Sequence, residues 1–541
     1  MTFNLLHEPW LTVLRTDGGA DEVSLLDAFR QGEAIRCLTG ELPTQVFALH
    51  RLMLAILHRA VPVETPGHWA QVRADRAGML ADVEGYLLEF EDRFDLFHPS
   101  RPFFQVADLR TPKGVVSDLK PLMLDVPARS QFLTVRSGHA LSRVPASYAA
   151  RWLVHVHAYD TSGLKSGTIA HPRATNPNGT IPPRGVGWAG QLGGIEVLGA
   201  SLSETLLRNL VGTATSGVLV THDAERDLPP WERTADDGQP RDPEPTGLVD
   251  LFTRQSRRVR LVGDRGGVTG VVLTYGDHVT PQDRHRLEPL SLWRFSEQQS
   301  KKSGHDTYMP SEHRTDRAFW RGLAALLPLT DVNRSAGKEQ REHFRPAVLT
   351  WNDRLRVEGL LPPGGIVRVH AIGVEYRDKS TAVHDLVDDT LDIPADLLAE
   401  ENHTLHATAL SAVRATEDAV YAVRTLARNV AAAAGDGAPD GAGERAGEAL
   451  YADVDLPFRT WLASLTVEET SDCALARWHR TARPLVMRHH DEIVESAGPA
   501  AWIGRPVSGR HVDLGIAEAW FLTKLRDALP LAHPAREEKT A

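Results

Sequence analysis

The sequence has 541 residues, of which 42% are hydrophobic, and a formal net charge of −11. This length and composition are typical of a globular protein with at least two domains and a large core. The negative charge argues against a protein that wraps nucleic acid over its whole surface, but it leaves local basic patches open.

The number of cysteines and the length of the apolar runs restrict where in the cell the protein is expected. Cys37 and Cys473 are the only cysteines, and they lie far apart in the sequence. There is no Cys/His spacing typical of zinc sites. No apolar run approaches the roughly 18 to 20 residues of a membrane span. We therefore expect a cytoplasmic protein that makes no contact with a membrane.

The N-terminal segment predicts a small sheet followed by a helix. FNLLHEPWLTVLRTDGGADEVSLLDAF is typical of two strands joined by a turn at Gly18 and Gly19, with a helix start after them. From Glu41 to Val61 the apolar residues recur at spacings of three and four, which indicates an amphipathic helix.

The rest of the chain divides into two regions that differ in composition and in the spacing of apolar residues. Between about Pro99 and Pro394, Pro and Gly separate short mixed segments, as in an α+β region with many loops. After Pro394 four Ala- and Leu-rich stretches have helical period and imply a four-helix bundle, with residues 435–447 as a flexible linker. We predict an α+β fold, with a mixed α/β domain over 1–393 and an all-α bundle over 394–541.

A glycine-rich segment, GVGWAGQLGG, spans Gly185–Gly194. It contains GxGxxG, but a dinucleotide-binding fingerprint needs a strand before the glycines and a helix after them. Here a Pro-rich loop precedes them and strand-like IEVLG follows. Residues without Cβ atoms let the backbone approach a partner closely, and an irregular surface loop of no function is the alternative.

Two basic segments follow. RQSRRVRLVGDR carries five arginines: Arg254, Arg257, Arg258, Arg260 and Arg265. WRFSEQQSKK ends in Lys301 and Lys302. Each is a candidate contact for a polyanion, and a solvated strand or loop face is the alternative.

Catalytic motifs are scarce. The sequence has neither GxxxxGK[ST] nor HExxH. The most enzyme-like segment is HDLVDD, which brings together His384, Asp385, Asp388 and Asp389. These residues could ligate a divalent metal for phosphodiester hydrolysis, although a solvated acidic turn is favoured. We expect no enzymatic activity, no cofactor, and a scaffold that binds a polyanion.

Several segments resemble one family in collinear order. FNLLHEPWLTV, the helix over 45–59 and FDLFHPSRPFFQV are similar to the large subunit of the type I-E CRISPR surveillance complex Cascade, the CasA family. SYAARWLVHVHAYDTSG, GVGWAGQLGGIEVLG and GLVDLFTRQSRRVRL continue the resemblance, which extends into the C-terminal helices. The family's large subunit is non-catalytic, reads the protospacer-adjacent motif (PAM) in double-stranded DNA and helps to start strand separation. The partners implied are other Cascade subunits, CRISPR RNA, target DNA and a helicase-nuclease.

The resemblance also implies DNA-contacting residues. The family's glycine loop, which enters the minor groove beside the PAM, aligns with Gly185, Gly187, Trp188, Ala189, Gly190 and Gln191, with Trp188–Gln191 at its tip. The family's lysine finger falls on Lys301 or Lys302.

Two further family elements align with this sequence. The wedge hairpin falls on Arg377, Lys379 and Ser380, where Lys379 and Ser380 replace the usual amides. A loop that contacts the RNA handle and nearby DNA falls on Phe132, Thr134 and Arg136. The competing hypotheses are a metal-dependent nuclease centred on His384 and Asp385, and a scaffold that binds only proteins.

Overall fold

The computed structural model describes residues 2–126, 134, 141–170, 179–213, 223–328, 343–362, 364–377 and 379–532. The chain forms two compact units. The first comprises Met1–Arg317, Arg341–Pro362 and Arg368–Thr390, and the second comprises Ala318–Gln340, Pro363–Val367 and Leu391–Ala541. That the ranges 1–393 and 394–541 are separate domains stays a prediction.

The N-terminal sheet contains the two predicted strands and a third strand that was not predicted. It is antiparallel, in the order β2-β1-β3, from β1 (Leu11–Arg15), β2 (Ala20–Val23) and β3 (Ile35–Leu38). Helix α1 (Leu25–Arg30) follows β2, and the Ser24 side chain caps its first turn.

The predicted helix over 41–61 is α2 (Pro43–Ala60), but it is buried rather than amphipathic. Even Gln45, His50 and Arg51 are buried, because α4 (Arg76–Glu89), α5 (Ala146–Tyr159), α6 (Leu202–Asn209) and α7 (Leu248–Phe252) pack around it. Helix α2 is therefore the core of the first unit, and its polar side chains need internal partners.

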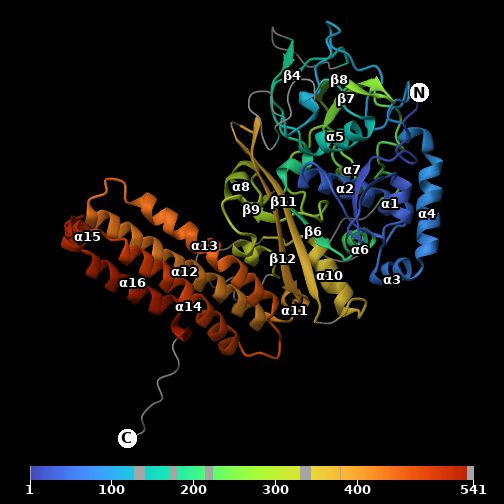
Figure 1. Cartoon of the computed structure of the whole chain (residues 1–541). Coiled ribbons are helices and arrows are strands. Elements are labelled where there is room, and N and C mark those ends of the chain that lie inside the picture. The colour runs from blue at the N-terminus through green and yellow to red at the C-terminus, as the bar shows by residue number, and fades with distance from the viewer. Residues whose placement is uncertain are drawn as a thin grey trace. The chain divides into compact units, whose positions relative to one another are not determined.

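A three-stranded sheet lies beside α2 and carries the candidate site. Its order is β12-β11-β6, from β6 (Gly194–Leu198), β11 (Ile366–Arg377) and β12 (Ala382–Pro394), and β11 is antiparallel to β6 (Figure 1). The first unit also contains two hairpin-like strand pairs: β7 (Arg257–Asp264) with β8 (Gly267–Tyr275), and β9 (Trp293–Phe295) with β10 (Tyr308–Pro310).

Short elements complete the first unit. They are α3 (Pro66–Ala74), α8 (Glu297–Ser303), α10 (Ala347–Val357), β4 (Lys165–Ser166), β5 (Thr180–Ile181), and the 3-10 turns η1 (Glu91–Phe94), η2 (Lys120–Leu122) and η4 (Trp188–Gln191).

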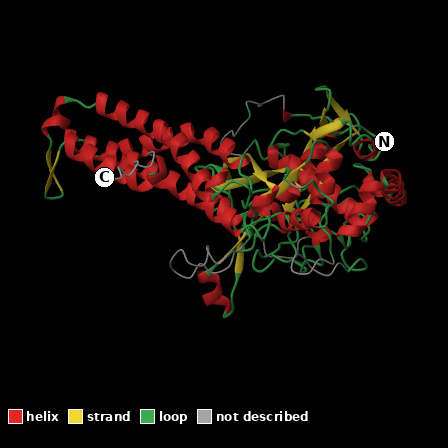
Figure 2. Ribbon diagram, turned by 90° about the horizontal axis from the view of Figure 1, so that it is seen from below, coloured by secondary structure: helices red, strands yellow, loops and turns green. Residues whose placement is uncertain are grey.

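The second unit is a bundle of four long helices that lie side by side in both ribbon views (Figures 1 and 2): α12 (His403–Ala434), α13 (Asp440–Ala463), α14 (Ser471–Glu495) and α16 (Leu514–Ala528). Phe458, Trp461 and Trp478 form an aromatic cluster between α13 and α14. The α+β fold with a C-terminal four-helix bundle is thus confirmed.

The C-terminal region is not entirely helical, which corrects one detail. A hairpin of β13 (Arg505–Val507) and β14 (Arg510–Val512) lies at one end of the bundle (Figure 2). Shorter elements are α11 (Ala395–Leu398), α15 (Pro499–Ile503), η5 (Phe319–Ala325) and η6 (Pro530–Ala532).

The flexible linker predicted over 435–447 is wrong for most of its length. Helix α12 is capped by Gly435 at φ 99°, and α13 already begins at Asp440. Gly443 and Gly447 lie on the face of α13 that meets α12, where a Cβ on Gly443 would be 2.8 Å from the carbonyl oxygen of Arg424. These glycines serve close helix packing, so their composition alone was misleading.

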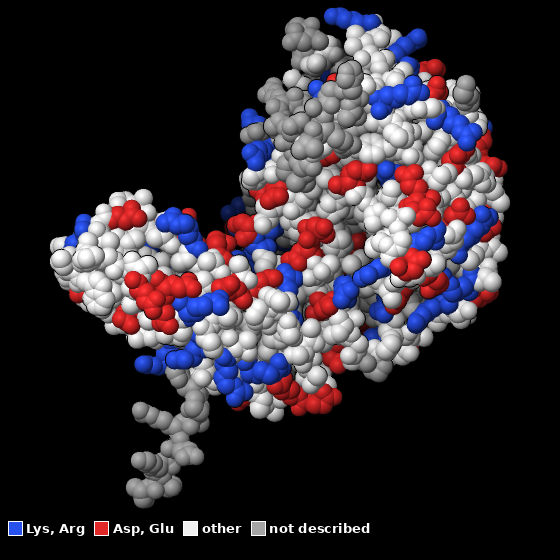
Figure 3. All heavy atoms as spheres, in the orientation of Figure 1, with Lys and Arg blue, Asp and Glu red and all other residues white. Residues whose placement is uncertain are grey.

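Surface charge is mixed. On the face drawn in Figure 3, basic and acidic side chains are interspersed. Among the described helices, none is both long and apolar enough to cross a membrane.

Candidate nucleic-acid interface

The glycine-rich segment is packed into the protein. Trp188 is only 2% exposed, Ala189 and Gly190 are also buried, and Gln191 is half-buried. The indole Nε1 of Trp188 donates to Glu288 at 2.9 Å, and Arg51 holds the same carboxylate with two bonds of 2.8 Å. Of the expected tip Trp188–Gln191, only Gln191 reaches the surface, and the other three residues are buried.

The glycines of this segment allow close approach to the protein's own chain. A Cβ on Gly187 would lie 2.4 Å from the backbone of Ala158, and one on Gly190 would lie 2.4 Å from the hydroxyl of Tyr376. Gly185 has φ 115°, in the region that favours glycine. The predicted close approach is real, but these contacts are internal, and a role of the segment in DNA binding stays a prediction.

Buried charges fix the start of the segment. Arg257 donates to the carbonyl oxygen of Gly185 at 3.0 Å and forms an ion pair with Asp160. Lys165 is the second cation on Asp160, at 2.6 Å. Burial alone would raise the pKa of Asp160, but Lys165 and Arg257 hold it below its usual value. Asp160 is thus an ionised anchor, and its carbonyl accepts from Gly187 N at 2.9 Å.

The predicted wedge is a hairpin, because β11 and β12 are neighbours in the sheet and its tip lies between Arg377 and Ala382. Lys379 and Ser380 both have positive φ, 60° and 63°, which forms the tight reversal. Lys379 is exposed. Arg377 is also exposed, and its guanidinium contacts the ring of His384 across the hairpin.

The hairpin tip and the glycine segment meet at Ser162. The backbone N–H of Ser162 donates to Ser380 O at 2.6 Å, and its hydroxyl accepts from Gly185 N at 3.0 Å. Next to the turn of the hairpin, Tyr376 donates to Tyr159 O at 2.7 Å and covers Gly190. Two segments almost 200 residues apart in sequence thus lie side by side.

The two candidate lysines lie on the short helix α8. The Ser296 side chain caps the start of α8, and Gly304 ends it at φ 79°. Lys301 is 74% exposed and pairs with Glu297 at 2.9 Å. Helix α8 connects β9 to β10, and Ser291, which precedes β9, bridges to Gly194. The β9–α8–β10 segment, which carries both lysines, therefore starts beside the end of the glycine segment.

Most of the loop predicted to contact the RNA handle lies outside the residues that the structure describes. Phe132 and Arg136 lie outside the described residues, and Thr134 is half-buried with no regular secondary structure.

The arginine-rich segment is not a surface patch. Arg254, Arg257 and Arg258 are buried, and each pairs with a carboxylate: Asp250, Asp160 and Asp277 respectively. Arg260 donates to Leu109 O at 3.1 Å, and Arg265 is exposed and pairs with Glu8. Burial of a guanidinium requires such partners, which here come both from nearby, as Asp250 does, and from a distant segment, as Asp160 does.

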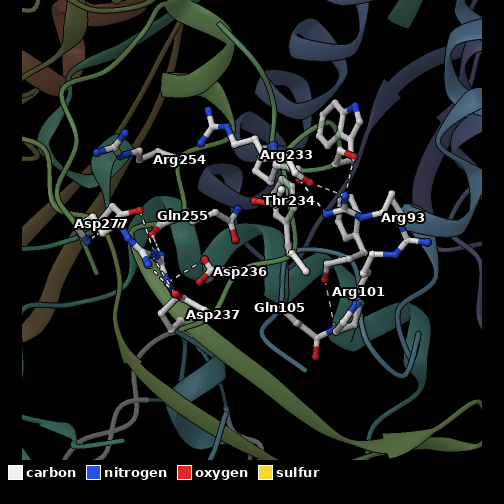
Figure 4. Close-up of a pocket in the computed structure, with 18 residues that line it drawn as sticks. Arg93, Arg101, Gln105, Arg233, Thr234, Asp236, Asp237, Arg254, Gln255 and Asp277 are labelled. Carbon is white, nitrogen blue, oxygen red and sulfur yellow. Dashed lines mark hydrogen bonds and ion pairs between the residues drawn. The ribbon is translucent and has the colours of Figure 1, made fainter. Parts of the chain in front are cut away.

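A cavity of about 270 Å³ next to this segment is lined by six arginines and three aspartates: Arg93, Arg101, Arg233, Arg241, Arg254, Arg258, Asp236, Asp237 and Asp277 (Figure 4). Arg93 donates to the carbonyl oxygens of Pro230, Trp231 and Arg233. Burial and the charge of Arg101 lower the pKa of Arg93, and burial raises the pKa of Asp236. The cations lining this cavity largely serve internal contacts.

The acidic segment considered for metal binding lies on strand β12, not in a turn. Successive side chains of a strand point to opposite faces, so His384 and Asp385 cannot ligate one ion together. Asp388 accepts from His370 at 2.7 Å instead. Within the described residues, no group of three or more His, Cys, Asp or Glu side chains could hold a metal ion.

The adjacent histidines of α14 are buried. His489 contacts Asp453 at 2.7 Å, and His490 contacts Glu518 at 3.2 Å. They therefore link α14 to α13 and α16 within the bundle.

Sequence reasoning missed the residues that join the site's parts. Ser162, Tyr376 and Glu288 make the contacts described above, yet no motif marks them. Only Tyr376 had a local signal, because it directly precedes the predicted wedge residues.

Comparisons with known proteins agree with this architecture. The sequence matches the family of the CRISPR-associated protein Cse1 over residues 4–489. The CRISPR-associated protein CasA/Cse1 of Thermus thermophilus is 28% identical over 80% of this chain and 78% of its own length.

Solved structures show the same fold. Cse1 from Thermobifida fusca superposes with a TM-score of 0.88 at 40% identity, covering 98% of this chain and 99% of that one. A chain of a CRISPR RNA-guided surveillance complex has a TM-score of 0.66 at 18% identity, covering 91% and 99%. With the family match over nearly the whole sequence, the chain belongs to the Cse1 (CasA) family of CRISPR-associated proteins.

Proposed function

We propose that this chain is the large, non-catalytic subunit of a type I-E CRISPR RNA-guided surveillance complex. In that role it recognises the PAM in double-stranded DNA, helps to open the duplex and recruits a helicase-nuclease. Its membership of the Cse1 family supports the proposal, as does the fold it shares with a chain of such a complex.

The observation that carries the proposal is the bridge at Ser162. It joins the tip of the β11–β12 hairpin to the start of the glycine segment through two backbone groups, at Ser380 and Gly185. A small hairpin beside a glycine-rich segment is narrow enough to enter the minor groove. Base recognition in that groove distinguishes mainly A·T from G·C pairs. We therefore expect tolerance of more than one PAM.

Because Trp188 is buried, the proposed contacts with DNA are assigned to other residues of the glycine segment. The parts of the segment that are not fully buried are Gly185 and Gln191, so these are the proposed contacts with DNA. Lys379 at the hairpin tip, and Lys301 or Lys302 on α8, are proposed to contact phosphates or base edges. The bundle is proposed to pack against other subunits, and the CRISPR RNA handle to lie near Thr134.

The test is equilibrium binding of the complex, assembled with CRISPR RNA, to duplexes with a correct and a scrambled PAM. We expect tighter binding to the correct duplex, and a loss of that preference in Gln191→Ala. Equal affinity of the wild-type complex for both duplexes would refute PAM recognition. Cleavage of labelled duplex by the complex with Mg²⁺, abolished by His384→Ala, would support the nuclease instead.

A further inference from the structure

A row of charged side chains crosses the sheet β12-β11-β6. His370, in the central strand, is the register partner of Glu196 on β6, and its Nδ1 is 2.9 Å from Glu196 Oε1. Its Nε2 is 2.7 Å from Asp388 Oδ1 on β12. Both ring nitrogens therefore face carboxylates, and only a doubly protonated imidazolium can donate to both at once.

Helix α2 adds a second histidine to the row. His50 Nδ1 is 2.8 Å from the other oxygen of Glu196, so the two histidines share this buried carboxylate. Burial alone would raise the pKa of Glu196, but His50 and His370 hold it well below its usual value. Burial alone would lower the pKa of His370, but its hydrogen bonds to Asp388 and Glu196 raise it to about 9.

The position of this row is informative. Strand β6 begins at Gly194, the last residue of the glycine segment, while β11 and β12 are the two strands of the hairpin. His370 thus adds side-chain contacts to the backbone pairing of the sheet, and these contacts link the strand that leaves one proposed DNA contact to both strands that carry the other.

We propose that His370 is a positioning residue for duplex recognition: its imidazolium clamps β11 and β12 to β6 and so fixes the hairpin tip relative to the glycine segment. This proposal rests on the proposed function. The clamp weakens when the ring loses its proton, because a neutral ring donates to only one of the two carboxylates.

The direction of the pH dependence follows from the groups that face the ring. These are Glu196 from β6, Asp388 from β12 and His50 from α2, with His313 nearby. Burial lowers the pKa of His313 to about 4, so His313 stays neutral above that pH. The pKa of His370 is raised in the fold, so its contribution is complete below pH about 6.5 and is lost as the pH rises through about 9.

The experiment compares two variants of the full chain, Asp388→Asn and Asp385→Asn. Both remove one negative charge from β12 at an exposed position, so both should fold, but only Asp388 contacts His370. NMR of labelled histidine, assigned with His370→Gln, gives the titration of the ring. Hydrogen exchange gives the opening of backbone amides 375–384 between pH 6.5 and 9.5.

We expect the His370 titration to move toward neutral pH in Asp388→Asn, and hairpin amides to exchange roughly fivefold faster than in wild type near pH 8. Asp385→Asn should match wild type in both measurements. An unchanged His370 titration in Asp388→Asn, or equal effects of the two variants, would overturn the clamp.

Binding of the assembled complex to correct and scrambled duplexes over the same pH range separates this proposal from the proposed function. If wild type shows no PAM preference at any pH, the proposed function fails. If wild type prefers the correct PAM, and Asp388→Asn keeps that preference as fully as Asp385→Asn up to pH 9.5, the positioning role is wrong. A preference lost at lower pH in Asp388→Asn alone supports it.

Discussion

The two most basic segments of the chain have opposite surroundings. On β7, Arg257 and Arg258 are buried and paired with carboxylates. On α8, Lys301 and Lys302 are exposed. Both segments looked like candidate contacts for a polyanion, yet Arg257 and Arg258 are inside the protein whereas the two lysines face solvent.

The difference lies in the residues between the cations. In the β7 segment the arginines are interspersed with Val259 and Leu261, which are buried. An arginine within such a strand is taken inside with its neighbours and needs a carboxylate there. Helix α8 has no buried residue, so its cations remain available. A basic run is therefore best judged by the apolar residues within it.

Removal of a buried arginine should have the largest effect. Arg257→Ala leaves Asp160 with only Lys165 as a cation and removes the donor to Gly185 O, so we expect a loss of about 3–5 kcal/mol in the free energy of unfolding. Chemical denaturation measures this. The control is Arg265→Ala, whose exposed pair with Glu8 should be worth about 1 kcal/mol or less. Equal losses in the two variants would mean that burial does not separate them.

A second test concerns the packing of the glycine segment. Gly190→Ala places a methyl group 2.4 Å from the Tyr376 hydroxyl, which should cost about 1–3 kcal/mol. Adding Tyr376→Phe removes that hydroxyl, leaves the nearest ring atom at 3.2 Å, and should recover part of the loss. Gly163→Ala, where a Cβ meets nothing within 4 Å, is the control. If Gly190→Ala is as stable as Gly163→Ala, the segment is not packed as described.

The packing of Gly190 against Tyr376 also decides which substitutions can test DNA binding. Gly190→Asp would add a negative charge to the glycine segment. Such a substitution would also displace Tyr376. Gln191→Ala, at a half-buried position on the same segment, is the better probe.

Features set by local pattern were predictable. The strands around Gly18 and Gly19, the helix near residues 41–61 and the helical C-terminal region all follow from periodicity and turn residues. The resemblance placed a hairpin at Lys379 and Ser380, and the structure has a β-hairpin there, while its role as a wedge stays a prediction.

Features set by distant partners were not predictable. Trp188 is buried because Glu288, 100 residues away, accepts its indole N–H. Gly443 looked like a linker residue because nothing nearby in sequence shows that Arg424 packs against it. The same holds for His370 and Glu196, which are 174 residues apart. Burial and ion pairing between segments far apart in the sequence therefore cannot be predicted from the sequence alone.

The lysines should affect binding without affecting stability. Lys301→Ala and Lys302→Ala remove exposed side chains, so unfolding should change by less than about 0.5 kcal/mol. A lysine on a phosphate should lower the slope of log K against log [salt] by about 1. A lysine on a base edge should instead reduce PAM discrimination. We expect one of the two to show the second behaviour and Lys379→Ala the first. If all three match wild type in slope and discrimination, neither assignment survives.

The smallest expected effect is an increase in affinity. Glu297 lies one turn before Lys301 and pairs with it at 2.9 Å, with both side chains mostly exposed. Such a pair is worth only about 0.3–0.5 kcal/mol, and DNA must compete with it for the ammonium group. Glu297→Gln keeps the size of the side chain, removes the competing charge and should tighten duplex binding by about twofold at low salt. In a Lys301→Ala background that gain should shrink, because the paired ammonium is gone. Salt-dependent binding of the four combinations gives the coupling, and an equal gain with and without Lys301 would assign the effect to general charge rather than to this lysine.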